Sequence, residues 1–111
     1  MIAVEVYRDN EGKICEFRRH KEEGLSEGHP LEVSISALVQ TAIIGLEDYL
    51  KLEPEVEEEK EGWLQCKLER EYFLNREIDA ILETMVLGLR ALERDHPELV
   101  EVREVGSDIK V

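Results

Sequence analysis

The sequence has few cysteines, few basic residues and no long apolar run, and each shortage excludes a class of protein. Its two cysteines, Cys15 and Cys66, have neither the spacing of a metal site nor the number needed for a disulfide framework. Reduced thiols are therefore expected, as in the cytosol. No apolar run approaches the roughly 20 residues that cross a bilayer, and the charged first residues do not resemble a signal peptide. We predict a cytoplasmic protein that does not bind a membrane.

The shortage of basic residues leaves the chain strongly acidic. Its 14 lysines and arginines stand against 27 aspartates and glutamates, which gives a formal net charge of -13. Nucleic acids and anionic membranes bind clustered cations, and the one basic cluster, residues 18–21, is too small to reverse the sign. We therefore expect no nucleic-acid partner. A basic protein partner is compatible with the charge, although solubility alone also explains it.

The chain contains no internal repeat and no linker, and its 111 residues suffice for one core, so we predict a single domain over residues 1–111. Residues 1–20 alternate apolar and polar side chains around a turn at residues 9–12, which predicts a β-hairpin. Residues 21–31 contain two glycines and a proline and are expected to form a loop, of a length that is often functional.

Apolar side chains at three- and four-residue spacing predict helices over residues 33–51 and 72–95. Ser34 or Ser36 is expected to cap the first helix, and Pro97 marks the end of the second. The predicted apolar stripes are Leu38, Val39, Ala42, Ile43, Leu46, Tyr49 and Leu50 in the first helix, and Ile78, Ile81, Leu82, Met85, Leu89 and Leu92 in the second.

Alternating patterns predict two strands within residues 55–68 and a last strand over residues 99–105. The resulting order, ββαββαβ, is typical of a two-layer α+β domain in which two helices cover one face of a mainly antiparallel sheet. The opposite face must meet solvent or a second copy of the chain, so we expect a homodimer. The glutamates within residues 55–61 are expected to form a solvated edge strand whose like charges discourage edge-to-edge pairing.

Three segments match a known family: SALVQTAIIGLE at residues 36–47, GWLQCKL at residues 62–68 and ETMVLGLRALERDHPELVEV at residues 83–102. With them the chain resembles the ribosomal-processing cysteine protease (Prp) family over roughly residues 1–105. The resemblance implies a Cys–His dyad that trims the N-terminal extension of a large-subunit ribosomal protein. In that family the histidine ends the second strand and the cysteine opens the first helix. A helix N-terminus and a nearby imidazole both lower the pKa of a thiol, which favours the nucleophilic thiolate.

The resemblance places the family histidine at His20 and puts Glu32 at the cysteine position. A glutamate cannot perform thiolate acyl transfer, so we interpret the chain as a Prp-like pseudoenzyme, a binding or regulatory module without cysteine-protease activity and without a cofactor. A basic peptide of a ribosomal protein is the expected ligand. It would lie between the loop and the first helix, where His29, Ser34 and Ser36 are candidate binding residues.

Both positions also have structural interpretations. An acid at Glu32 interacts favourably with the helix dipole, by ~0.3–1 kcal/mol, and His20 is expected to pair with Glu32 or Glu22. Neither cysteine supplies the missing nucleophile. Cys66 lies on the apolar side of its strand, and Cys15 lies about 16 Å from His20 at ~3.3 Å per residue.

Other chemistry stays open at this stage. Ser34 or Ser36 could act as a nucleophile with His20, which would make the chain a hydrolase with rewired catalysis. His20, His29 and Glu32 together are a ligand set of metal-binding type, although we expect no resident metal. A structural dimer without any function in the cleft is a further alternative.

Overall fold

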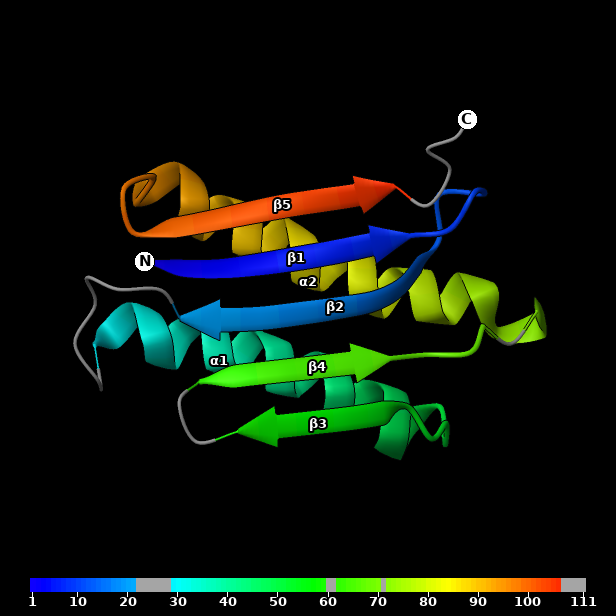
Figure 1. Ribbon diagram of the computed structural model, residues 1–111. Coiled ribbons are helices and arrows are strands. Elements are labelled where there is room, and N and C mark those ends of the chain that lie inside the picture. Colours follow the sequence, from blue (N-terminus) through cyan, green and yellow to red (C-terminus); the bar gives the residue numbers. More distant parts are fainter. Residues whose placement is uncertain (22–28, 60–61, 71, 107–111) are drawn as a thin grey trace.

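The computed structural model describes residues 1–21, 29–59, 62–70 and 72–106, and it confirms the predicted order of strands and helices (Figure 1). A five-stranded sheet forms one layer, and two helices cover one of its faces, so the chain has the two-layer α+β fold. The elements are β1 (Ile2–Arg8), β2 (Ile14–Lys21), α1 (Pro30–Ile44), a π-helical turn η1 (Gly45–Tyr49), β3 (Glu55–Glu59), β4 (Trp63–Lys67), a 3-10 turn η2 (Tyr72–Leu74), α2 (Asn75–Asp95) and β5 (Val100–Gly106).

The strands follow the order β3-β4-β2-β1-β5 across the sheet. All neighbouring strands are antiparallel except β1 and β5, which are parallel because the chain returns through α2 to the far edge. The sheet is therefore mixed, and mainly antiparallel as predicted. Every side chain of the edge strand β3 is exposed, in agreement with the expected acidic edge.

The core lies between the inner face of the sheet and the two helices. Ile2, Val4 and Val6 are buried beneath the helices, which confirms the alternation that predicted β1. The apolar stripe predicted for α2 also faces this core. Its buried side chains are Ile78, Leu82, Met85, Val86 and Leu89, with Ile81 and Leu92 packed at the margin.

Helix α1 begins at Pro30 and not at residue 33, where it was predicted to begin. Proline suits the first helical position, because its fixed φ matches a helix and its missing N–H needs no partner there. The cap is His29, whose Nδ1 accepts a hydrogen bond from the backbone N–H of Leu31 at 3.1 Å. The prediction that Ser34 or Ser36 caps this helix is therefore wrong.

The far end of this helix also differs from the prediction. After Ile44 the chain forms the π-helical turn, in which the N–H of Leu50 donates to the carbonyl of Gly45 at 3.1 Å. The wider turn changes the angular position of the side chains that follow. Tyr49, predicted to lie in the apolar stripe, is consequently 80% exposed. Lys51 then adopts a left-handed φ of 59° just past the end of the helix.

By length and mean hydropathy alone, the helical segment Pro30–Tyr49 could cross a membrane, contrary to our expectation. A core helix of a globular protein passes the same test of length and composition. The apolar face of this segment packs on the sheet. Its buried side chains are Leu31, Ile35, Val39, Ala42, Ile43 and Leu46.

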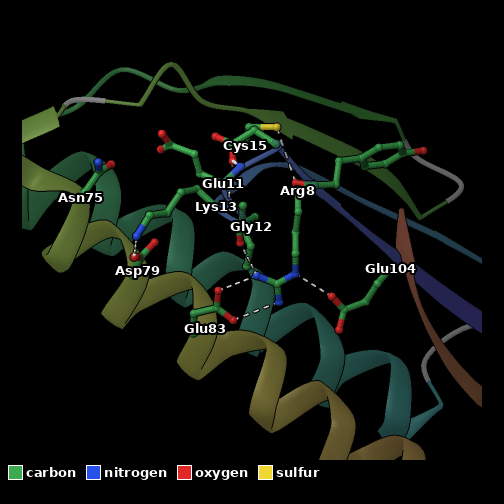
Figure 2. Close-up of polar contacts among 12 residues, drawn as sticks. Arg8, Glu11, Gly12, Lys13, Cys15, Asn75, Asp79, Glu83 and Glu104 are labelled. Carbon is green, nitrogen blue, oxygen red and sulfur yellow. Dashed lines mark hydrogen bonds and ion pairs between the residues drawn. The ribbon is translucent and has the colours of Figure 1, made fainter. Parts of the chain in front are cut away.

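Ion pairs attach the hairpin end of β1 and β2 to α2 and β5 (Figure 2). Arg8 pairs with Glu83 on α2 and with Glu104 on β5, each at 2.6 Å. Figure 2 also shows Lys13 reaching across to Asp79, with Nζ 2.7 Å from Oδ2. These contacts hold the hairpin turn at one end of the sheet, and the last residues of β2 lie at the other end.

Asp79 is the shared anion of two cations. Besides Lys13, Arg70 approaches it with Nη2 2.6 Å from Oδ1. Burial raises the pKa of Asp79, but the hydrogen bonds from Lys13 and Arg70 outweigh burial and leave the pKa below its ordinary value. The ionised carboxylate is therefore the form that stabilises the fold.

Replacing Asp79 by asparagine is expected to lower the free energy of unfolding at neutral pH by about 1 kcal/mol, because Lys13 and Arg70 lose their common anion. The folded-state pKa lies below the unfolded one. The stabilisation is thus present above about pH 3.9, the pKa of an aspartate in the unfolded chain. It is lost as the pH falls through the pKa of Asp79 in the folded state. Urea unfolding should show a gap between wild type and D79N that closes below about pH 4.

The matched control is D95N, at the exposed last residue of the same helix, which should leave the urea midpoint nearly unchanged at every pH. A D79N gap of constant size over the whole pH range would contradict the role of the ionised carboxylate.

Candidate functional site

A cleft of about 730 Å³ is lined by the last residues of β2, the first half of α1, the end of β3 and Gly62 of the β3–β4 turn. Figure 1 shows that the ends of β2 and β3 and the start of α1 lie on the same side of the molecule. Small residues keep it open: α1 contributes Ser36 and Ala37, and the turn contributes Gly62. Gly62 has a left-handed φ of 86°, and a Cβ at this position would lie 3.7 Å from the Cβ of Lys21. The charged residues of the lining are Arg19, Lys21, Glu32, Glu58 and Glu59.

Strand β2 decides which of its side chains enter this cleft. In the antiparallel pairing with β1, Arg19 lies opposite Val4 and Lys21 lies opposite Ile2. Val4 and Ile2 are buried beneath the helices, and directly opposed side chains point to the same face of a sheet. Arg19 and Lys21 therefore point toward α1. The residue between them, His20, points to the opposite face.

His20 belongs to a layer of paired charges on the open face of the sheet. Its Nε2 lies 3.7 Å from Oε2 of Glu5. Glu5 also accepts a hydrogen bond from Tyr7 at 2.9 Å and pairs with Arg103 at 3.4 Å. Burial raises the pKa of Glu5, but the Tyr7 hydrogen bond and the charges of His20 and Arg103 outweigh burial, so the pKa is lowered.

Glu32 occupies the first turn of α1, on the cleft side of the sheet. Its Oε2 lies 3.1 Å from Nζ of Lys21, so an ion pair joins the end of β2 to the start of α1, by charge attraction and without the geometry of a hydrogen bond. The carboxylate is also stabilised by the positive end of the helix dipole. The predicted pairing of Glu32 with His20 is therefore wrong. The other predicted partner, Glu22, lies outside the described residues.

The two candidate serines lie in different places. Ser36 is half-buried and lines the cleft. Ser34 lies outside it, along the groove between α1 and α2, and donates to the carbonyl of Pro30 at 3.0 Å. Because His20 is on the far face of the sheet, the structure brings neither serine to this imidazole.

The metal-type ligand set is not assembled. His29 is held as the helix cap, and His20 and Glu32 lie on opposite faces of the sheet. Within the part of the chain that the structure describes, no group of three His, Cys, Asp or Glu side chains could hold a metal ion.

The sequence pattern did not predict five of the residues that meet in this cleft: Arg19, Lys21, Gln40, Glu58 and Glu59. The amide of Gln40 on α1 donates to Glu58 on β3 at 3.2 Å, which closes one side of the cleft. The sequence did contain a signal for Arg19 and Lys21. Alternate residues of a strand point to the same face, so both lie on the face of Phe17, which is buried in the core. Nothing local in the sequence indicates that β3 reaches this cleft.

The family model for cysteine protease Prp matches residues 1–101 of the chain. The chain belongs to the cysteine protease Prp family. Crystal structures of the Prp ribosomal processing protease from Staphylococcus aureus, with a substrate peptide and with a covalently linked product peptide, match with TM-scores of 0.82 and 0.83. Each is 19% identical and covers 95% of this chain and 100% of that chain.

A crystal structure from Streptococcus mutans matches this Prp-family chain with a TM-score of 0.77 and 18% identity, over 96% of both chains. At such identities the likenesses establish the Prp fold and nothing finer. The comparison with curated proteins finds no match.

Both thiols of this Prp-family chain lie away from the cleft. Cys66 faces the core opposite Phe17, and burial raises its pKa to about 12. Cys15 is half-buried and donates to the carbonyl of Tyr7 at 3.6 Å. Burial, together with the nearby charge of Asp9, raises the pKa of Cys15. Neither sulfur is thus prepared as a nucleophile.

We expect Cys66 to be almost inert toward a disulfide reagent such as DTNB in the native protein. A thiol with a pKa of about 12 is almost fully protonated near neutral pH, and this one is also buried. At about pH 8 the thiolate fraction alone should slow its reaction ~1000-fold relative to the unfolded chain. The variant C15S isolates Cys66, and C66S isolates Cys15 as the matched control. Rapid labelling of native C15S would show that the strand opens or that the thiol is ionised.

Proposed function

We propose that this Prp-family chain binds a basic peptide of a ribosomal protein in the cleft and does not cut it by cysteine-protease chemistry. The observation that carries the proposal is the ion pair between Lys21 and Glu32 at 3.1 Å. It lies at the start of α1, where the family resemblance implies the nucleophilic cysteine. A carboxylate paired with a lysine there links two elements of the fold, and it is a poor nucleophile toward a peptide bond.

The charge of the cleft supports a basic peptide as the ligand. Glu58 and Glu59 are exposed on the edge strand β3 and stand at the rim. The chain as a whole carries a formal charge of -13, which attracts cationic segments from a distance. The similar Staphylococcus aureus Prp was crystallised with a substrate peptide. Attraction of this kind weakens as salt is added, because the rim is open to solvent.

The orientation of His20 supports the absence of cysteine-protease activity. A dyad needs an imidazole within hydrogen-bond reach of the nucleophile. His20 pairs with Glu5 on the open face, while Glu32 lies on the helix face. A thiol introduced at the helix N-terminus would therefore still have no base from this residue.

A hydrolase with rewired catalysis is the alternative, and one observation favours it: Ser36 is half-buried and lines the cleft. A serine nucleophile needs a general base beside its hydroxyl. Among the described residues that line the cleft there is no histidine. Labelling of Ser36 by a fluorophosphonate would establish this alternative and exclude a purely binding role.

Incubation with a synthetic peptide of the ribosomal-protein extension should give binding without cleavage. Mass spectrometry over hours should find only intact peptide with the wild-type protein, and a titration should show affinity that falls with salt. Time-dependent cleavage that is lost in H20A would contradict the proposal directly.

The variant E32C sharpens this test, because it restores a thiol at the family position. The helix N-terminus and Lys21 should lower the pKa of the new thiol, so that iodoacetamide labels it faster than either native cysteine. Peptide cleavage should nevertheless stay at background, since His20 faces away. Cleavage by E32C would show that the imidazole reaches the cleft.

The cytoplasmic location and the homodimer remain predictions. On the open face many of the described charges form ion pairs, as in Arg18–Glu16 at 2.6 Å, so this face suits water. The helix layer exposes more apolar surface, including Ile44, Tyr49 and Leu87. Sedimentation velocity should show a dimer that L87K weakens and R18M does not. A monomer at all concentrations would exclude the dimer.

A further inference from the structure

Arg19 is the most buried charged residue that the structure describes. Only 7% of its surface is exposed, and it lies in one cross-strand row with Val4 and Leu64, both at 0%. Its Nε is the one nitrogen of the guanidinium that is both buried and without a hydrogen bond. The guanidinium is always charged in a protein, so the fold holds a cation whose Nε is buried at the edge of the cleft.

A buried cation without a partner is costly, and proteins normally pair such a group or leave it out. The carboxylates of the cleft are engaged elsewhere. Glu32 is paired with Lys21, and Glu58 accepts the amide of Gln40. Glu59 is exposed at the rim. Arg19 Nε can gain an acceptor when these side chains rearrange, when water enters or when a ligand binds, and the cleft that Arg19 lines gives a ligand access.

The surroundings of Arg19 indicate which anion fits. A planar guanidinium binds a carboxylate or a phosphate through two parallel hydrogen bonds. Three glutamates, Glu32, Glu58 and Glu59, line the same cleft and disfavour a doubly charged phosphate. A peptide that is cationic apart from one carboxylate suits both parts of the cleft, since the carboxylate can bind Arg19 and the cationic part can face the glutamates. Glu58 lies two strands from Arg19, roughly 10 Å at ~4.8 Å per strand, which about three extended residues span.

We propose that Arg19 is the anchor of a carboxylate-binding site, which takes a peptide whose carboxylate lies about three residues from a lysine or arginine. The inference rests on the proposed peptide binding and adds the group that the cleft recognises. The carboxylate enters and forms paired hydrogen bonds with the guanidinium, while the basic side chain faces Glu58. The carboxylate belongs either to the C-terminus of the peptide or to an acidic side chain.

Three short peptides distinguish these sources in a calorimetric titration with the full chain. The first is acetyl-Lys-Ala-Ala-Leu with a C-terminal carboxylate, the second is the same peptide as an amide, and the third is acetyl-Lys-Ala-Ala-Glu as an amide. At least one carboxylate-bearing peptide should bind ten-fold or more tightly than the leucine amide, about 1.4 kcal/mol per factor of ten. Whichever carboxylate gives the gain identifies the source.

The variant R19M should abolish this preference and leave the affinity for the leucine amide within about threefold, since only the charged anchor is removed. R19K keeps the charge but lacks the planar fork, so it should retain part of the preference. R18M is the matched control, because this neighbouring arginine points to the open face and pairs with Glu16. It should bind all three peptides as wild type does.

A second readout does not depend on any ligand. Because R19M removes a buried Nε that has no hydrogen bond and keeps an apolar side chain in its place, its melting temperature should equal or exceed that of wild type. Equal affinity for all three peptides, or a preference that survives in R19M, would overturn the carboxylate site while leaving peptide binding intact. Binding of none of the peptides would overturn both. A large drop in the melting temperature of R19M would show instead that Arg19 is a structural residue.

Discussion

The alternation of side chains along β2, held in register by β1, determines the chemistry of the cleft. Phe17, Arg19 and Lys21 point toward the helices and His20 points away, because a pleated strand turns successive side chains to opposite faces. A slip of one residue would expose Phe17, so the hydrophobic core fixes this assignment. The buried Nε of Arg19, the lysine that reaches Glu32 and the distant imidazole all follow from it.

Charges are arranged differently in the three regions of the molecule. On the open face and at the hairpin end, many of the described anions and cations form ion pairs, as Arg8 does with Glu83. These pairs stabilise the scaffold and orient the sheet on α2. In the cleft the pairing is incomplete at Arg19, although the chain has 27 acidic residues. The contrast favours a recognition role for this arginine, since acidic residues are abundant and none that the structure describes forms an ion pair with it.

Much of the fold could be predicted, because the periods of two and of three to four residues report directly on which face of an element is buried. The strands β1 and β4 and the stripe of α2 followed these periods. The start of α1 did not, since Pro30 and His29 form a start signal that the apolar pattern does not include. Tyr49 lies outside the apolar stripe because the π-helical turn changes the angular position of the side chains that follow it. The amino-acid composition does not predict where such a turn occurs.

The candidate site was less predictable than the fold. The presence of a glutamate at position 32, where the family resemblance implies a cysteine, and the shortage of thiols are properties of the residues themselves, and the sequence alone determined them. Which face His20 occupies, which lysine neutralises Glu32 and whether Arg19 has an acceptor were decided only by the tertiary structure. These outcomes depend on strand register and on where α1 and β3 pack, and both are set by contacts between residues far apart in the chain.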